Sequence, residues 1–415
     1  MAKKDYDWEN GAVLEDHSRK KHTILAKYFE QYLLVRCRIP NMERFRLAVV
    51  DGFSGSGEYA CGTHGSPLIL LETVINALNF INHKRIADGF RTLSIECLFI
   101  FNDLQKVAID KLKQNIAPLE AVIRTHNNIK TEIIYQCKPF EKIYPDIKQK
   151  ISDGSYSNVF FNLDQCGTSH VSLSTIRDIV NSWKSSEVLF TFAIETLLSY
   201  LPTDPNLPRT IVSQQMDTEI YAALRDTNVV INKKEWLGRV EQIVSNHLRD
   251  CAVYVSPFSI HNPNGWKYWL VHFAKSYRAR QVYNDILHDD DVEQAHFGRS
   301  GLKMLSYNPS NEGQLYLFNE SSRESAKADL YDDIPRFISE SGDMLLMQDF
   351  YSAIYSETPA HSDDIHDMII ENSDLEVITD SGGTRRSANA IKSTDFIKLK
   401  PQRQMFFMHE KPTKK

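Results

Sequence analysis

The sequence lacks the marks of metal ribbons, membrane spans and uniformly basic surfaces. Its six cysteines are scattered and form no CxxC pair, so neither a zinc ribbon nor an iron–sulfur motif is expected. No apolar run approaches the roughly eighteen residues that a membrane helix needs. The formal net charge of −6 argues against binding nucleic acid over the whole surface and leaves only a local basic patch for that role. We therefore expect no metal and no membrane contact.

Glycine and proline are also scarce, at 17 and 15 of 415 residues, so no fibrous or long disordered segment is expected. The polar N-terminal residues contain no apolar core of a signal peptide. The scattered cysteines are typical of reduced thiols, which favours a cytoplasmic protein. What remains is an ordinary soluble composition in a chain long enough for two or three domains.

Strand and helix patterns alternate through the first three hundred residues. Alternation of this kind produces βαβ units, so we expect an α/β fold with a mostly parallel sheet and helices on both faces. Residues 200–233 read as an irregular insertion. The expected strands are Leu47–Asp51, Ile95–Asp103, Glu132–Cys137, Asn158–Asp164, Val188–Glu195, Cys251–Pro257 and Trp266–Ala274. The expected helices are His17–Val35, Pro67–Leu78, Val107–Ile116, Ser174–Trp183 and Glu235–Leu248.

A glycine-rich loop follows the first expected strand. Asp51 ends the strand, and glycines follow at positions 52, 55 and 57. Glycine lets a ligand approach the backbone closely, although a tight turn without a ligand uses the same residue. The order acid-x-Phe-x-Gly-x-Gly fits the loop of S-adenosylmethionine (SAM) methyltransferases better than the dinucleotide fingerprint. The segment that would lie against SAM is Asp51, Gly52, Phe53, Ser54, Gly55 and Gly57.

Asp103 closes the second expected strand, where a carboxylate is placed to accept both hydroxyl protons of a ribose. The alternative is that it caps the helix that follows. Asn102 is the second candidate for the ribose.

Polar residues also follow the fourth expected strand. Asp164, with Asn162 and Gln165, could orient a substrate amine, or the segment could be a plain strand end with a turn. Cys166 is a candidate substrate contact but has no activating base nearby in the sequence, so an inert thiol is favoured. On the first helix, Lys21 and His22 form a polar edge that lines a pocket, binds a phosphate or faces solvent.

The composition turns polar in residues 306–333, which reads as a linker. Two helices (Leu345–Ser356 and Ser362–Asn372) and a hairpin (Leu375–Thr379 and Ala390–Leu399) follow, and this order predicts a winged helix-turn-helix over 334–407. The hairpin is basic. It would contact nucleic acid, dock on a protein or simply face solvent. The candidate nucleic-acid contacts are Arg385, Arg386 and Lys392.

Several motifs together resemble the three-Cys-motif partner family (TcmP), which is bacterial and phage-associated. The glycine loop with the later Gly65-Ser66-Pro67-Leu68 is similar to that family's D-x-F-A-G-P-G and G-S-P-L. Weaker matches are Lys21-His22-Thr23-Ile24-Leu25, Phe161-Asn162-Leu163-Asp164-Gln165-Cys166-Gly167 and Tyr268-Trp269-Leu270-Val271.

The resemblance implies a Rossmann-like SAM methyltransferase domain over 10–305 and a radical-SAM-like partner protein with three cysteines. It implies that Asp164 is catalytic and that Asp51, Phe53, Gly55 and Gly57 line the SAM pocket. Gln165 and Cys166 stand where the family has proline and an aromatic residue, so the pattern D-P-P-[YF] of DNA amino-methyltransferases is poorly met.

The leading hypothesis is a SAM-dependent methyltransferase acting on nucleic acid or on a substrate made with the partner. The alternatives are a non-catalytic SAM- or nucleotide-binding accessory subunit and a dehydrogenase using the same loop.

Overall fold

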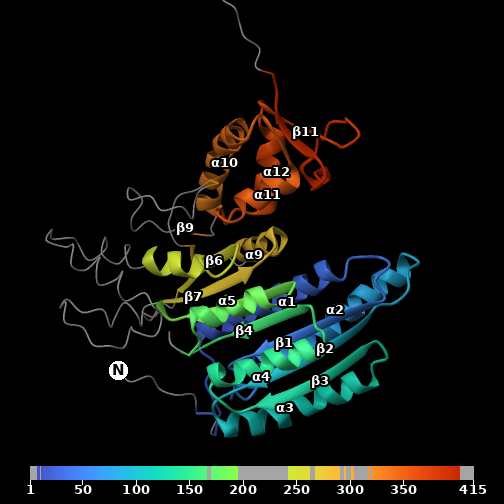
Figure 1. Cartoon of the computed structure of the whole chain (residues 1–415), viewed down its shortest axis with the longest axis vertical. Helices are drawn as coiled ribbons and strands as arrows, with labels where there is room; N and C mark the ends of the chain where they lie inside the picture. The colour runs from blue at the N-terminus through green and yellow to red at the C-terminus, as the bar shows by residue number, and fades with distance from the viewer. Residues whose placement is uncertain are drawn as a thin grey trace, which may run out of the picture.

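The computed structural model describes residues 7–9, 11–165, 170–194, 242–261, 267–289, 294–295, 301–302, 316–317 and 320–401. A large twisted sheet with flanking helices forms the body of the molecule, and a smaller group of C-terminal elements lies against it (Figure 1). None of the described helices is long and apolar enough to cross a membrane.

The central sheet has nine strands in the order β3-β2-β1-β4-β5-β7-β6-β8-β9. The first five strands pair in parallel, whereas β7 runs antiparallel to both β5 and β6. The chain order reverses between β1 and β4, which is where ligands bind in open α/β sheets. The strands are β1 (Arg44–Asp51), β2 (Ser94–Asn102), β3 (Ile129–Gln136), β4 (Asn158–Leu163), β5 (Ser185–Phe192), β6 (Tyr254–His261), β7 (Lys267–Ala274), β8 (Gln294–Ala295) and β9 (Tyr316–Leu317).

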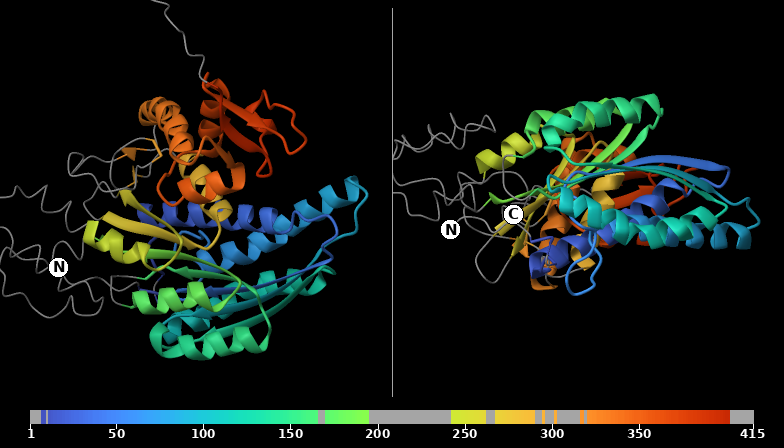
Figure 2. Two further views of the ribbon diagram at one scale, coloured as in Figure 1. Left: turned by 45° about the horizontal axis from the view of Figure 1, so that its top comes forward. Right: turned by 90° about the horizontal axis from the view of Figure 1, so that it is seen from below.

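Both faces of this sheet are covered by helices, and the strands are apolar on both sides for that reason. In β1, Leu47 and Val49 enter one core, whereas Ala48 and Val50 enter the other. The two helical layers are visible when the sheet is seen from below (Figure 2). One layer holds α1 (Asp16–Arg36), α2 (Ser66–Ala87), α3 (Lys106–Thr125) and α9 (Tyr277–Asp289), and the other holds α4 (Phe140–Asp153), α5 (Leu173–Ser182) and the helical residues 242–249.

The predicted α/β fold with a mostly parallel sheet and helices on both faces is therefore confirmed. The pattern did not predict α4, because Pro139 precedes it and Pro145 lies inside it, and internal proline normally disfavours a helix. The predicted insertion at 200–233 and the first half of the predicted helix Glu235–Leu248 lie outside the described residues.

The polar segment 306–333 differs from the predicted linker. Residues 316–317 form β9 in the main sheet, and α10 (Glu320–Glu340) begins well before residue 334. Serine and acidic residues dominate α10, yet Ala326, Leu330, Ile334 and Ile338 recur every four residues and are all buried. One such row of apolar residues on a helix face is enough to pack the helix against a core. The polar composition of the segment led instead to the prediction of a linker.

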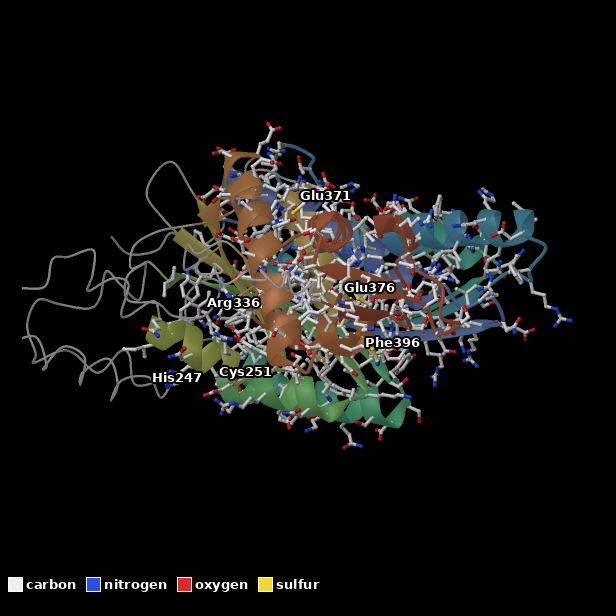
Figure 3. The ribbon with its side chains drawn as sticks, turned by 90° about the horizontal axis from the view of Figure 1, so that it is seen from above. His247, Cys251, Arg336, Glu371, Glu376 and Phe396 are labelled. Atoms are coloured by element: carbon white, nitrogen blue, oxygen red, sulfur yellow. The ribbon has the colours of Figure 1, made fainter. Side chains whose placement is uncertain are left out.

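The C-terminal elements form a second, three-stranded antiparallel sheet in the order β10-β12-β11. Seen from above, these elements lie over the main sheet, with Glu371, Glu376 and Phe396 marking α12, β11 and β12 (Figure 3). The predicted pair of helices is present, and the predicted hairpin is present with a second strand shorter than the predicted Ala390–Leu399; α10 and β10 are additional. The elements are β10 (Met344–Leu346), α11 (Met347–Ile354), α12 (Ser362–Glu371), β11 (Leu375–Ile378) and β12 (Phe396–Leu399).

Helix α9 fastens the C-terminal elements to the main sheet. Its buried side chains reach backbone carbonyls of the segment between α11 and α12. The Nε of Arg280 donates to Tyr355 O at 3.2 Å, and the amide of Asn284 donates to Thr358 O at 3.0 Å. Ser362, the first residue of α12, donates through its backbone N and its hydroxyl to Asp285 at 2.8 and 2.9 Å. The start of α12 is thus held by the main domain.

A buried polar cluster ties three elements of the main domain together. Glu187 of β5, only 6% exposed, accepts a hydrogen bond of 2.5 Å from the hydroxyl of Tyr28 in α1. His272 of β7 lies 3.5 Å from the same carboxylate oxygen. Burial and the nearby Glu187 raise the pKa of Tyr28, so the phenol keeps its proton and donates it. A buried carboxylate without its donors is costly, so this cluster specifies how α1, β5 and β7 meet.

We expect Tyr28→Phe to destabilise the fold by about 1–3 kcal/mol, because it removes a donor from a buried carboxylate. Tyr135→Phe is the matched control: Tyr135 donates to Glu120 at 3.1 Å, but both side chains are only half-buried, so water replaces the lost partner. Thermal denaturation measures both. Equal losses of Tm in the two variants would contradict the role assigned to the buried cluster.

Candidate functional site

The structure brings the glycine loop and Asp103 together. The backbone N of Gly55 donates to Asp103 Oδ2 at 3.0 Å, and the backbone N of Gln105 donates to Oδ1 at 2.8 Å. Burial raises the pKa of Asp103, although these two backbone donors act in the opposite direction. The backbone of Leu104 also acts on this carboxylate in that direction, and since a carboxylate has about four lone-pair positions, capacity remains for a further donor. Loop and acid thus form one unit at the carboxyl ends of β1 and β2.

Asn102 holds this unit in place. Its side-chain amide donates to Gly52 O at 3.1 Å, and its side-chain oxygen accepts from the backbone N of Lys138 at 3.2 Å. Its backbone oxygen accepts from Ser54 N at 2.9 Å. The residue is buried and its side chain is engaged, so it positions the loop. Of the two predicted ribose contacts, Asp103 is therefore the one whose side chain can still accept hydrogen bonds from a ligand.

The glycines of the loop make room for side chains of the protein itself. A Cβ on Gly55 would lie 2.6 Å from the indole of Trp8, and one on Gly57 would lie 2.5 Å from Leu68. Both glycines have positive φ, at +56° and +77°, which also favours glycine. The glycine pattern is therefore explained in part by internal packing, which agrees with the alternative of a tight turn that binds no ligand.

An apolar surface lies open beside Asp103. Leu104 follows it directly and is 65% exposed, and Val107 in the first turn of α3 is 37% exposed. Exposed apolar side chains next to a half-buried carboxylate suit a ligand with a flat apolar part and hydroxyls. The sequence analysis missed these two residues, although an apolar residue directly after the strand-ending acid was a signal that could have identified them.

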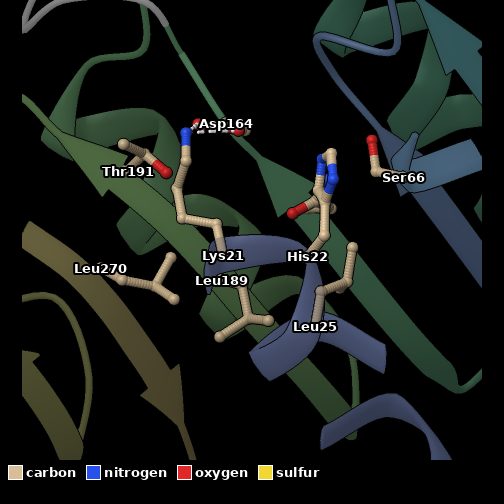
Figure 4. Close-up of a pocket in the computed structure, with 9 residues that line it drawn as sticks. Lys21, His22, Leu25, Ser66, Asp164, Leu189, Thr191 and Leu270 are labelled. Atoms are coloured by element: carbon tan, nitrogen blue, oxygen red, sulfur yellow. Dashed lines mark hydrogen bonds and ion pairs between the residues drawn. The ribbon is translucent and has the colours of Figure 1, made fainter. Parts of the chain in front are cut away.

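A small pocket lies under α1 at the reversal point of the sheet. Lys21 and Asp164 meet across it, with Lys21 Nζ 2.5 and 2.6 Å from the two carboxylate oxygens (Figure 4). The pocket is lined by Lys21, His22 and Leu25 of α1, Ser66 of α2, Asn162 and Asp164 at the end of β4, Leu189 and Thr191 of β5, and Leu270 of β7. The predicted residues Lys21, His22, Asn162 and Asp164 therefore share one site.

Lys21 determines the charge state of Asp164. Burial alone would raise the pKa of Asp164, but the charge of the Lys21 ammonium and its hydrogen bonds to the carboxylate hold it below its ordinary value. Asp164 is accordingly an ionised carboxylate whose two oxygens are both used by Lys21.

Asp51 and His22 bring unsatisfied polar atoms to the same region. Asp51 is fully buried; burial raises its pKa to about 7, against hydrogen bonds from Ser66, Phe53 N and Asn162. Its Oδ2 has no hydrogen-bond partner among the described residues. Burial lowers the pKa of His22 to about 4, so the imidazole is neutral near pH 7, and its Nδ1 also has no partner within the described part of the chain. Buried polar atoms of this kind are normally satisfied by a ligand or water.

Gln165 contacts its own loop, and Cys166 lies outside the described residues. The side-chain oxygen of Gln165 accepts from the backbone N of His170 and of Val171, both at 3.0 Å, which leaves this buried residue a loop-forming role. Phe53 packs against Phe140, with ring centroids 6.0 Å apart.

The three predicted nucleic-acid contacts differ from one another. Arg385 forms a two-pronged ion pair with the buried Asp395, at 2.9 and 3.0 Å, and thereby closes the loop between β11 and β12. Arg386 and Lys392 are exposed on the same loop. Only these two of the three present their charge to solvent, because Arg385 is used within the fold.

Comparison with known proteins gives no family. No protein-family model matches the sequence, and no curated protein matches it. Among solved structures, a putative O-methyltransferase from Klebsiella pneumoniae shares 8% identity, with 64% of this chain and 92% of that chain covered and a TM-score of 0.21. A loganic acid methyltransferase solved with SAH shares 8% identity, with 94% and 98% covered and a TM-score of 0.23. Both neighbours are methyltransferases, at TM-scores too low to assign residues.

We expect Gly55→Ala to destabilise the protein clearly more than Gly62→Ala. Both positions have positive φ, which costs an alanine about 1–2 kcal/mol. A Cβ at Gly62 meets nothing within 4 Å, whereas one at Gly55 strikes the Trp8 ring and adds about 1–3 kcal/mol of overpacking. Calorimetric Tm values compare the two. A Gly55→Ala variant no less stable than Gly62→Ala would show that Trp8 does not pack on the loop.

Proposed function

We propose that this chain binds SAM and transfers its methyl group. The observation that carries the proposal is the contact between Gly55 N and Asp103. It joins the glycine loop to the carboxylate after β2 at the carboxyl ends of the parallel strands, next to the point where the chain order reverses. The mixed sheet with its antiparallel β7 is consistent with a Rossmann-like methyltransferase fold.

The residues present fit such a cofactor. Asp103 has lone pairs left for the ribose hydroxyls, and Leu104 and Val107 offer an apolar wall for the adenine. The unpartnered Oδ2 of Asp51 suits the ammonium of the methionine end. When bound, SAM supplies a methyl group activated by the sulfonium, and the protein supplies position and charge.

The dehydrogenase alternative is disfavoured by topology. The dinucleotide-binding order 3-2-1-4-5-6 continues with a parallel sixth strand beside β5. Here the neighbour of β5 is β7, which runs antiparallel, with Val188 opposite Phe273. NAD should therefore not bind where SAM does.

One observation favours the accessory alternative. Asp164, which the resemblance implies is catalytic, has both oxygens on Lys21, so it can orient a substrate only after Lys21 has left it. Tritiated SAM incubated with the chain, DNA, RNA and a three-cysteine protein of the kind that the resemblance implies separates the two functions. Incorporation supports the enzyme, and tight SAM binding without incorporation supports the accessory subunit.

We also propose that the C-terminal elements form a winged helix whose contact surface is the loop between β11 and β12. Support comes from the order helix, strand, two helices and hairpin, with β12 central in the sheet. A DNA reader uses the start of its second helix, but here Ser362 at the start of α12 is held by Asp285. The exposed Arg386 and Lys392 are then the contacts for DNA, RNA or the partner protein.

We expect SAM to bind the purified chain in calorimetry and Asp103→Asn to weaken binding by about 1–3 kcal/mol, because two ribose hydroxyls lose a charged acceptor. Asp110→Asn is the matched control, since Asp110 is an exposed acid on α3, the helix that follows Asp103, and pairs with Lys113 at 3.7 Å. NAD should give no heat. Unchanged SAM affinity in Asp103→Asn would remove the carboxylate from the site, and no SAM heat in the wild type would end the proposal.

We expect SAM affinity to rise with pH through about 7. Since burial raises the pKa of Asp51 to about 7, the carboxyl is largely protonated below that pH and cannot attract an ammonium. The same shift makes folding stability fall as pH rises from the ordinary range of an aspartate to about 7, because the folded state prefers the protonated form. Titrations at pH 6, 7 and 8 check this. In Asp51→Asn the pH dependence should vanish; if it persists, another group is responsible.

A further inference from the structure

The pair of Lys21 and Asp164 is built like a recognition site for an alkylammonium ion. The Lys21 ammonium contacts both oxygens of Asp164 at 2.5 and 2.6 Å, and it lies 5.7 Å from the centre of the Tyr268 ring. The imidazole of His17 stacks on the Tyr268 ring itself, with the ring centroids 4.6 Å apart and the planes at 10°, which fixes the orientation of Tyr268. A carboxylate beside an aromatic face is a combination that attracts organic cations.

The hollow beside the charged pair is narrow, so the carbon chain of a bound cation would take the space that the Lys21 side chain leaves. Leu25, Leu189 and Leu270 line it below the charged pair. The side chain of Lys21 is 9% exposed and that of Asp164 25% exposed, so solvent reaches the carboxylate. Asp164 directly follows β4, whereas Lys21 stands on a long flexible side chain of α1, so the lysine is the partner that can move away.

Resting on the proposed function, we propose that the methyl acceptor is an aliphatic primary amine that replaces Lys21 on Asp164. Lys21 is then an internal stand-in for the substrate, which keeps the carboxylate ionised until an acceptor arrives. The negative charge of Asp164 would repel an acceptor that carries a carboxylate, whereas it attracts an acceptor that carries an ammonium group.

The chemistry balances with SAM as the only co-reactant. The bound ammonium first loses one proton to water, which frees its lone pair. The amine then forms a nitrogen–carbon bond with the methyl group, and the carbon–sulfur bond breaks with its electrons staying on sulfur. The product leaves as an N-methylammonium ion, and the sulfonium has become a neutral thioether. Asp164 holds the acceptor nitrogen in place throughout, which is catalysis by positioning.

The test is replacement of the tethered ammonium by a free one. The Lys21→Ala variant of the full chain is titrated with n-propylammonium chloride, and binding is followed by Tm and by calorimetry without SAM. We expect n-propylammonium to bind this variant about tenfold more tightly than the neutral isostere n-propanol does. We also expect it to bind this variant about tenfold more tightly than it binds the wild type, where Lys21 competes for Asp164. The double variant Lys21→Ala/Asp164→Asn should lose this preference. If Lys21→Ala does not fold, Lys21→Gln removes the charge while keeping most of the side chain.

The outcomes separate the acceptor from the cofactor. Equal binding of n-propylammonium and n-propanol, or binding unaffected by Asp164→Asn, overturns the cation site. When the amine binds, SAM and n-propylamine are incubated with the same variant, and N-methylpropylamine detected by mass spectrometry supports the proposal. If SAM and amine both bind and no product forms, the acceptor assignment is wrong. If the amine binds but SAM does not, the proposed function fails and the acceptor role with it, while the cation site stands.

Discussion

The parallel pairing of β1 with β2 on one side and β4 on the other determines where every candidate residue of the main domain lies. Asp51 is in register with Phe101 and with Asn162, so the carboxyl ends of the three strands meet at one edge. The loops that leave these ends carry Asp103 and Asp164. Three acids that are 52 and 61 residues apart in the sequence therefore lie at the same end of the parallel strands, where the reversal of chain order between β1 and β4 places a ligand site in open α/β sheets.

Along the same face, polar and apolar layers alternate with depth. Going back along the strands from their carboxyl ends, the pair Lys21 and Asp164 comes first, Leu189 of β5 and Leu270 of β7 come next, and Glu187 of β5 and His272 of β7 follow. The alternation follows from strand geometry, because residues two apart on β5 and on β7 point to the same side. The polar pair at the carboxyl ends of the strands and the polar cluster in the core are thus separated by a layer of leucine side chains.

Much of the fold could be predicted from the sequence because local pattern determined it. The apolar strands predicted a sheet that is buried on both faces. The glycine loop and Asp103 could be picked out as candidate site residues because they stand at the ends of predicted strands. What could not be predicted depends on long-range contacts. Nothing in the sequence around Lys21 indicated that it would meet Asp164, 143 residues away. Trp8 against Gly55 and Arg385 against Asp395 are of the same kind, since each pair is created by the fold.

Helix α9 is shared by two parts of the molecule. On one side Arg280 and Asn284 hold carbonyls of the segment before α12, and on the other Tyr283 meets Tyr28 of α1 edge-on, with ring centroids 5.4 Å apart. Lys21 and His22 stand two turns earlier on that same α1. Helix α9 is therefore in contact with both parts at once. A tilt of the C-terminal elements would either break the buried hydrogen bonds from Arg280 and Asn284 or press α9 against α1, the helix that carries Lys21 and His22.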